Sequence, residues 1–149
     1  MAAPIIGIAS DHAAFDLKGR LCAFLKEQGA MVRDFGPHSP EACDYPAFVV
    51  PCAQALASGE LDLAVVACGS GIGASISANK VKGVRAALCL EVEQGILSRQ
   101  HNDARCLVLA ARLRGMEQNL AIVEAWLAAA FEGGRHQRRI ELLHQLTAC

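Results

Sequence analysis

The chain has 149 residues, of which 53% are hydrophobic and 19% are charged. This length covers one hydrophobic core and is too short for two ordinary domains, so we expect residues 1–149 to form a single domain. The net charge of -1 leaves no overall positive field that would attract nucleic acid or an anionic membrane. An anionic ligand would therefore have to be bound by groups that the fold brings together locally.

The sequence predicts a cytoplasmic protein. Met1 to Pro4 lacks the basic start of a signal peptide. No apolar run approaches the ~18 residues that a membrane span needs. The seven cysteines are an odd number and form no C-x-x-C pair, which fits reduced thiols better than a disulfide framework.

Short apolar runs with β-branched residues alternate with longer helical patterns. This alternation is typical of an α/β protein in which helices cover both faces of a parallel sheet. The expected strands are residues 5–9, 31–35, 63–67, 85–89 and 106–110. The expected helices are residues 17–28, 47–58, 74–80, 92–100, 116–130 and 137–146. Gly29 stands where the first helix would be capped, and Pro51 is expected to kink the second helix or delay its start.

The last predicted helix follows the break Glu132-Gly133-Gly134 and a basic segment, residues 135–139. Its apolar face consists of Ile140, Leu142, Leu143 and Leu146. Because such a face must be buried, we expect this C-terminal helix to pack on a partner subunit.

Candidate site residues follow the predicted strands. Ligands of open parallel sheets bind beyond the carboxyl ends of the strands. The segments in question are Ser10-Asp11-His12, Asp44-Tyr45-Pro46, Cys68 to Gly73, His101-Asn102-Asp103 and Arg112. His101-Asn102-Asp103 differs from the others because it follows the helix after the fourth strand. We take all of them together as the candidate site.

The glycine-rich stretch Cys68-Gly69-Ser70-Gly71-Ile72-Gly73 is the strongest local signal. Alternating glycines at a strand-to-helix junction can turn several backbone N–H groups toward one oxyanion. The stretch is not a Walker loop or a dinucleotide fingerprint, because no Gly-Lys-Ser/Thr follows and Ile76 occupies the last glycine position. Ser70 also lacks the outer glycines of a nucleophile elbow. The alternative is a tight turn that needs glycine only for its backbone angles.

Cys68 is a candidate base. It ends an apolar strand just before a helix N-terminus, which lowers the pKa of a thiol, whereas burial raises it. A cysteine in this place can also be a small core residue. Beside an oxyanion site, however, a base is what proton abstraction next to a carbonyl requires.

Two histidines have both a functional and a structural interpretation. His101 lies in a polar stretch, where it can act on a ligand or form a helix C-terminal cap with Asn102. Asp11 can be a helix cap with His12 as an incidental neighbour.

Arginines are the candidate phosphate ligands. Arg112, Arg135 and Arg139 carry forked donors suited to a phosphate. Arg135 and Arg139 share one helical face if the last helix starts early enough. The alternative is a solvated basic face, which we prefer for Arg138.

Taken together, these motifs closely resemble the B-type ribose-5-phosphate isomerases, in the wider family that includes galactose-6-phosphate isomerase subunits. The resemblance runs in order along nearly the whole chain. It rests on Ser10-Asp11-His12, Asp44-Tyr45-Pro46, Cys68 to Gly73, Ala78-Asn79-Lys80, Ser98 to Asp103 and Glu132 to His136. It implies a Rossmann-like, three-layer α/β/α sandwich that works as a homodimer, or as a tetramer, with active sites shared between subunits.

The resemblance also implies the chemistry: a cofactor-free aldose-ketose isomerase of pentose phosphate metabolism that acts on a small sugar phosphate. Cys68 would be the base that moves a proton between C2 and C1, and His101 would open the furanose ring. Ser70 would relay protons between the oxygens. Asp11 or Asp44, together with Asn102, would orient the hydroxyls.

Further residues would bind the substrate. The backbone amides of Gly69, Ser70, Gly71, Ile72 and Gly73 would stabilise the enediolate, and Tyr45 belongs to the same set. The phosphate would be held by His12, Arg135 and Arg139, joined by Arg112 and His136 from the other subunit.

Other functions remain open at this point. A hydride-shift isomerase would need a metal, and no His, Asp or Glu cluster in the sequence has ligand spacing, so no metal site is expected. The same constellation suits a four-carbon or six-carbon aldose phosphate, such as erythrose 4-phosphate, allose 6-phosphate or galactose 6-phosphate. Different classes are a non-catalytic phosphosugar- or nucleotide-binding module and a Cys/His hydrolase built on Cys68 and His101. Local departures from the family are Pro51 and Val92 to Gly95, where many relatives carry an aromatic residue.

Overall fold

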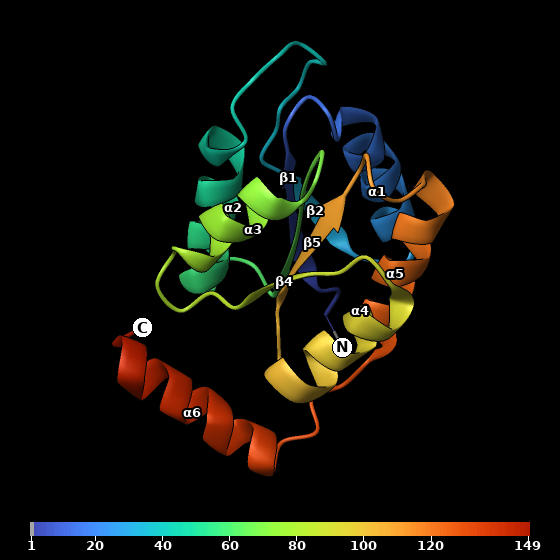
Figure 1. Ribbon diagram of the computed structural model, residues 1–149. Helices are drawn as coiled ribbons and strands as arrows, with labels where there is room; N and C mark the ends of the chain where they lie inside the picture. Colours follow the sequence, from blue (N-terminus) through green and yellow to red (C-terminus); the bar gives the residue numbers. More distant parts are fainter. Residues whose placement is uncertain (1) are drawn as a thin grey trace.

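The computed structural model describes residues 2–149 and contains a five-stranded parallel sheet in the order β2-β1-β3-β5-β4. Its strands are β1 (Ile5–Ser10), β2 (Met31–Asp34), β3 (Leu63–Cys68), β4 (Ala86–Leu88) and β5 (Cys106–Ala110). Its helices are α1 (Phe15–Glu27), α2 (Pro46–Ala57), α3 (Ile72–Asn79), α4 (Val92–Asn102), α5 (Met116–Ala128) and α6 (Arg135–Thr147). Figure 1 shows the sheet at the centre of the molecule with helices on both sides.

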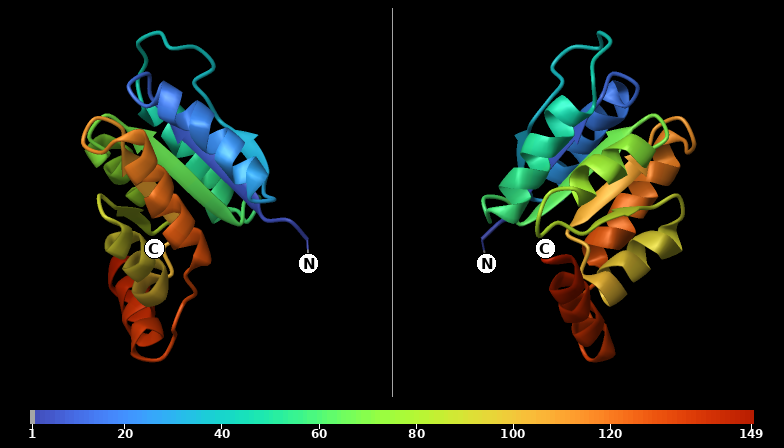
Figure 2. Two further views of the ribbon diagram at one scale, coloured as in Figure 1. Left: turned by 90° about the vertical axis from the view of Figure 1, so that its right-hand side faces the viewer. Right: turned by 60° about the vertical axis from the view of Figure 1, so that its left-hand side comes forward.

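Two helical layers cover the sheet and confirm the predicted α/β/α sandwich. Helices α1, α4 and α5 lie on one face, and α2 and α3 on the other (Figures 1 and 2). Every residue of β5 is buried, as is every residue of β3 except Leu63. Strands covered on both faces have no solvent side, which is why these two segments are continuous apolar runs rather than alternating ones.

The predicted strands and helices are all present, with small shifts at their ends. β4 is shorter than predicted and spans only Ala86–Leu88. It lies at the edge of the sheet, where it pairs with β5 alone. α3 begins at Ile72 and α6 at Arg135, each two residues before the predicted start. Gly29 has a φ of +87° directly after the end of α1, as a helix cap requires.

Pro51 was expected to kink the second helix or delay its start, and the delayed start is wrong. α2 begins at Pro46 and runs through Pro51. Pro46 fits at the first helical position, where no N–H partner is needed. Pro51 cannot donate to the carbonyl of Ala47, but both residues are exposed, so water can bind that carbonyl group.

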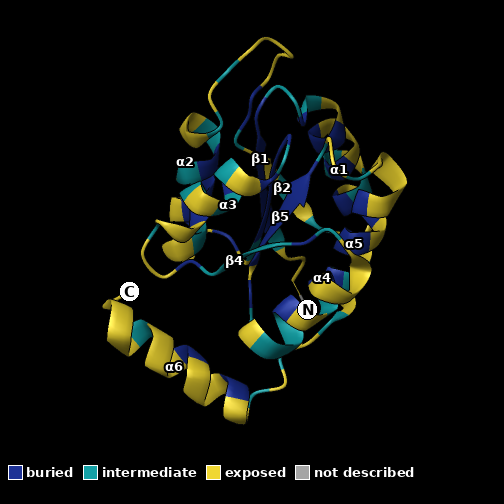
Figure 3. Ribbon diagram, in the orientation of Figure 1, coloured by how far each residue is buried: buried dark blue, intermediate teal, exposed yellow. Residues whose placement is uncertain are grey.

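α6 extends away from the sandwich at its lower end and contacts α4 (Figures 1 and 2). Most of its surface is exposed, as the yellow ribbon in Figure 3 shows. Ile140 is buried against the body, whereas Leu142, Leu143 and Leu146 are 51%, 47% and 78% exposed. One chain therefore leaves most of the apolar face of this helix uncovered.

None of the helices within residues 2–149 is both long and apolar enough to cross a membrane.

Trp126 is the largest fully buried side chain of the core, and its Nε1–H donates to the Ala104 carbonyl at 3.0 Å. We expect Trp126→Ala to lower the free energy of unfolding by about 3–5 kcal/mol, because it opens a cavity and leaves that carbonyl unpaired. Urea unfolding at one fixed protein concentration measures the change. The control is Glu124→Ala on the exposed side of α5, which should stay within about 0.5 kcal/mol of wild type. Equal stability of the two variants would contradict this assignment of the core.

Candidate active site

An open pocket of about 600 Å³ lies at the carboxyl edge of the sheet, where β1, β3 and β5 end. From the neighbouring strands β1 and β3 the chain proceeds to opposite sides of the sheet, to β2 and to β4. Such a switch point is where open parallel sheets bind ligands. The pocket is lined by the predicted residues Asp11, Tyr45, Cys68, Gly69, Ser70, Ile72, Gly73 and Arg112, and by Ile76 and Leu113.

The glycine loop is shaped by close contacts that a side chain would prevent. Gly71 has a φ of +76°, and a Cβ atom there would lie 2.4 Å from Leu88 Cδ1 and 3.1 Å from the Leu109 carbonyl oxygen. A Cβ atom on Gly73 would lie 2.4 Å from Cζ of the Tyr45 ring. The backbone can therefore turn tightly into α3 while Tyr45 packs directly on it.

Hydrogen bonds fix the same loop at two points. The Ile72 N–H donates to Ser70 Oγ at 3.2 Å. The Arg112 N–H donates to the Gly69 carbonyl at 2.9 Å, which places the Arg112 side chain beside the loop. The bond to Ser70 has two consequences: the Ile72 amide is already occupied, and the Ser70 hydroxyl proton remains available to another acceptor.

Cys68 and Asp11 lie deep in the pocket wall. They are 4% and 8% exposed, respectively. Cys68 is the last residue of β3, and Asp11 directly follows the neighbouring strand β1. Asp11 Oδ1 accepts the Ala14 N–H at 3.1 Å. The helix-cap interpretation of Asp11 is wrong, because Ala14 is the N-cap residue of α1 and Asp11 pairs a backbone N–H just before the helix. The Asp11 side chain also lines the pocket.

His12 and Asp44 lie near this edge but do not line the pocket. Nδ1 of His12 is 3.2 Å from both the backbone N and the backbone O of Cys43, in the loop between β2 and α2. This contact leaves Nε2 of His12 available to another partner. Asp44 is exposed next to Tyr45.

The remaining predicted residues lie elsewhere, which corrects the grouping made from the sequence. α4 begins at the carboxyl edge of the sheet and carries the chain back, so His101 and Asn102 at its end lie at the opposite edge, close to the start of β5 (Figure 1). The side chains of Arg135, His136 and Arg139 belong to the first turns of α6, which packs there against α4. Within one chain, none of these five residues lines the pocket that contains Cys68.

The predicted phosphate ligands are divided in the same way. His12 and Arg112 belong to the carboxyl edge, whereas Arg135 and Arg139 stand with His136 on α6. The expected pairing of His12 with the two α6 arginines on one subunit, and of Arg112 with His136 on the other, does not hold. As predicted, Arg135 and Arg139 share a helical face, because α6 starts early enough to include both.

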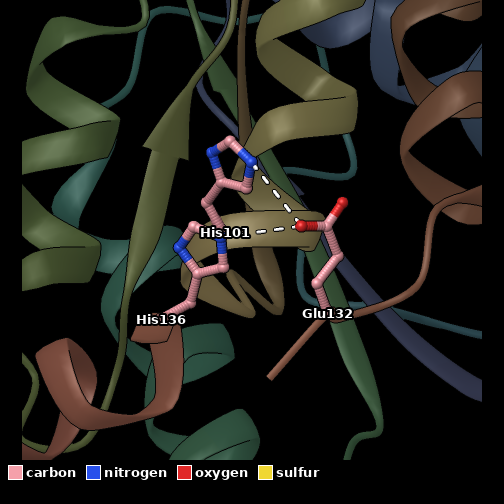
Figure 4. A group of neighbouring side chains, drawn as sticks. All are labelled: His101, Glu132 and His136. Carbon is pink, nitrogen blue, oxygen red and sulfur yellow. Dashed lines mark ion pairs between the residues drawn. The ribbon is translucent and has the colours of Figure 1, made fainter. Parts of the chain in front are cut away.

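His101 and His136 stack on each other at the second location. Their ring centroids are 4.2 Å apart and the rings are nearly parallel, with an interplanar angle of 12° (Figure 4). Oε2 of Glu132 lies 3.9 Å from Nε2 of His101 and 3.5 Å from Nε2 of His136. Burial lowers the pKa of His136, and His101 and Arg135 act in the same direction, while Glu132 opposes them.

Glu132 is the site residue that the sequence analysis missed. The sequence places it in a glycine-containing break, but its N–H donates to the Gln100 carbonyl at 3.0 Å and so fixes it beside the last turn of α4. The i, i+4 spacing of Glu132 and His136 was the available signal. Spacing along the chain predicted no metal site, but the fold brings the ligand atoms of His101, Glu132 and His136 within 4.8 Å of one another.

Comparison with known proteins identifies the family. The model of the family described as Ribose/Galactose Isomerase matches residues 6–143. The chain belongs to this family. It is 46% identical over 138 residues to ribose-5-phosphate isomerase B of Escherichia coli K12, with 93% of each chain covered.

Solved structures of this isomerase family have the same fold. Ribose-5-phosphate isomerase B of Clostridium thermocellum superimposes with a TM-score of 0.95 at 46% identity, with 97% of each chain covered. The Mycoplasma genitalium enzyme, solved with bound ribulose 5-phosphate, gives a TM-score of 0.93 at 40% identity and covers 97% of this chain and 96% of its own.

Gly71 and Gly69 provide a matched test of the loop geometry. We expect Gly71→Ala to lower the free energy of unfolding by about 1–2 kcal/mol or more, because of its left-handed backbone and because the added Cβ meets a backbone carbonyl. Gly69→Ala should cost less, because its Cβ would meet only the Arg112 side chain, at 3.2 Å. Thermal unfolding of both variants measures the difference. A Gly71 variant as stable as the Gly69 variant would contradict the described loop.

Proposed function

We propose that this chain is an aldose-ketose isomerase that interconverts ribose 5-phosphate and ribulose 5-phosphate through a cis-enediolate. The observation that carries the proposal is the position of the Cys68 thiol beside the glycine loop, in a pocket at the switch point of the sheet. An enediolate route needs a base at C2 and donors for the developing oxyanion, and these two are adjacent here.

In this proposal Cys68 removes the proton from C2 and returns it to C1. Backbone amides of the segment Gly69 to Gly73 stabilise the enediolate oxygen, except that of Ile72, which donates to Ser70 Oγ. That bond orients the Ser70 hydroxyl so that its proton can move between the two substrate oxygens. The Asp11 carboxylate is held by the Ala14 N–H, so it can orient a substrate hydroxyl from a fixed position.

The division of the site residues supports a homodimer with shared active sites. Cys68 and His101 are at opposite edges of one sheet, so the subunit that supplies the base cannot also supply the ring-opening group. We propose that each site combines the pocket of one subunit with His101, Asn102, Arg135, His136 and Arg139 of the other. The uncovered apolar face of α6 supports the same arrangement, because a second subunit can bury it.

The phosphate would then be held from both sides. His12 and Arg112 would approach it from the carboxyl edge of one subunit, and Arg135 and Arg139 from α6 of the partner subunit. Binding the phosphate far from C2 orients the sugar for the chemical step. The complete unit would be a single-domain, cytoplasmic subunit in a dimer or tetramer.

A different sugar phosphate is the second candidate. The family description includes galactose as well as ribose, and the pocket is open, at about 600 Å³. Six-carbon substrates of the allose 6-phosphate or galactose 6-phosphate type, or four-carbon erythrose 4-phosphate, would use the same base and oxyanion donors.

Proton NMR in deuterated buffer with a chelator tests the proposal, with ribose 5-phosphate, erythrose 4-phosphate and allose 6-phosphate offered separately. We expect deuterium incorporation together with ketose formation, fastest on ribose 5-phosphate. Cys68→Ala should slow both processes by about 100- to 10,000-fold on every substrate, because it removes the base. Binding without exchange on any sugar would leave a binding module and contradict the isomerase.

His101→Asn is the matched variant in the same experiment. Erythrose 4-phosphate cannot close a furanose ring, because its C4 oxygen is esterified. The variant should therefore lose activity on ribose 5-phosphate and retain most of it on erythrose 4-phosphate. Equal losses on the two substrates would argue against ring opening as the role of His101.

Mixing the two variants tests the shared site. Cys68→Ala and His101→Asn chains, unfolded together and refolded, should regain about one quarter of wild-type activity on ribose 5-phosphate. Random pairing puts about half of the chains in mixed dimers, and each mixed dimer has one intact site. Sites built within one chain would give no recovery.

A further inference from the structure

The stacked histidine pair contains a buried nitrogen without a hydrogen-bond partner. The His136 side chain is only 6% exposed, and its Nε2 has no partner within hydrogen-bond geometry. Figure 4 shows this ring and that of His101 lying on one side of the Glu132 carboxylate. Buried polar atoms are nearly always paired, so an unpaired one that faces a carboxylate calls for an explanation.

We propose that His101, Glu132 and His136 form a binding site for Zn²⁺ or a similar divalent transition-metal ion, and that this ion competes with ring opening by His101. Imidazole nitrogen and carboxylate oxygen are the ligands such ions prefer, and two histidines with one glutamate leave one position open for water. Metal binding is independent of the proposed isomerase activity. Only the competition rests on it.

The distances are close to those of a metal site. Two ligand atoms on one tetrahedral Zn²⁺ lie roughly 3.3 to 3.5 Å apart, given metal-ligand distances of about 2.0 to 2.2 Å. Glu132 Oε2 is 3.5 Å from His136 Nε2 and 3.9 Å from His101 Nε2. A small side-chain movement is therefore enough to bring the carboxylate and the His136 imidazole onto one ion, whereas His101 has to move farther.

The parallel stacking determines which residue has to move. A metal ion lies in the plane of each imidazole that binds it, so two stacked rings cannot share one ion. The His136 ring is buried, whereas 37% of the His101 side chain is exposed. His101 can therefore rotate out of the stack while His136 and Glu132 stay in place, and in that orientation it is withdrawn from a substrate.

Nearby charges limit the affinity without excluding the ion. Arg135 and Arg139 lie close enough to His136 to repel a cation. Both arginines are exposed, so solvent and salt screen their effect. Glu132 supplies a negative charge that directly faces both rings.

The test measures Zn²⁺ binding by titration calorimetry in a full-length chain with Cys22, Cys43, Cys68 and Cys149 replaced by Ser, which removes the pocket thiol and the exposed or half-buried thiols as competing ligands. We expect Glu132→Gln in this background to weaken binding by at least about tenfold, because even the loss of a group that only orients a metal ligand costs about 10- to 100-fold in affinity. The control is Glu124→Gln, an exposed residue of α5 that should leave binding unchanged. His136→Gln should weaken binding as Glu132→Gln does.

Two further readouts complete the experiment. Co²⁺ bound to the same chain should give visible bands without a thiolate charge-transfer band. In the enzyme with Cys68 intact, Zn²⁺ should inhibit turnover of ribose 5-phosphate more than that of erythrose 4-phosphate, each compared with its rate in the presence of chelator.

Two results would overturn the site: an affinity for Zn²⁺ that the Glu132 and His136 variants leave unchanged, or a cobalt-thiolate spectrum. If the variants lose Zn²⁺ binding but Zn²⁺ inhibits turnover of both sugars equally, the metal site stands and only its competition with ring opening by His101 is overturned.

Discussion

A helix that follows a parallel strand has to carry the chain from the carboxyl edge of the sheet back to the amino edge. This constraint decides where every site residue of the molecule lies. The loops after β1, β3 and β5 meet at one edge and bring Asp11, Cys68 and Arg112 together. The end of α4 must lie at the other edge, and His101 goes with it. A single sheet of this type therefore presents two half-sites that face away from each other.

Each half-site has its own physical basis. At the carboxyl edge, backbone geometry dominates: Gly71 adopts a left-handed conformation and Gly73 lies in contact with the Tyr45 ring, so main-chain amides and the Cys68 thiol border one pocket. At the amino edge, side-chain charge dominates: one carboxylate faces two imidazoles, Arg135 directly precedes His136, and Arg139 follows about one turn later on α6. The first half suits an oxyanion next to a carbon acid, and the second suits the ring oxygen and phosphate of a sugar.

α6 links the chemistry to assembly. The same helix carries Arg135, His136 and Arg139 at its start and exposed leucines farther along. A partner subunit that buries these leucines would also receive the basic residues. Association and phosphate binding would then depend on one element, which fits the exposed position of α6 outside the sandwich.

The amino-acid sequence alone was enough to predict the layers of the fold, because continuous apolar runs such as β5 and the periodic pattern of α1 depend on local burial and spacing. It was also enough to predict the glycine loop, since the glycines and the neighbouring Cys68 are adjacent in the chain. Only the tertiary structure separated His101 from Cys68 and brought Glu132 to the histidine pair. Spacing along the chain does not report the direction of a helix across the sheet, nor which loop returns to which edge. The separation of His101 from Cys68 is set by the topology, and the position of Glu132 is set by single contacts such as the hydrogen bond from its N–H to the Gln100 carbonyl.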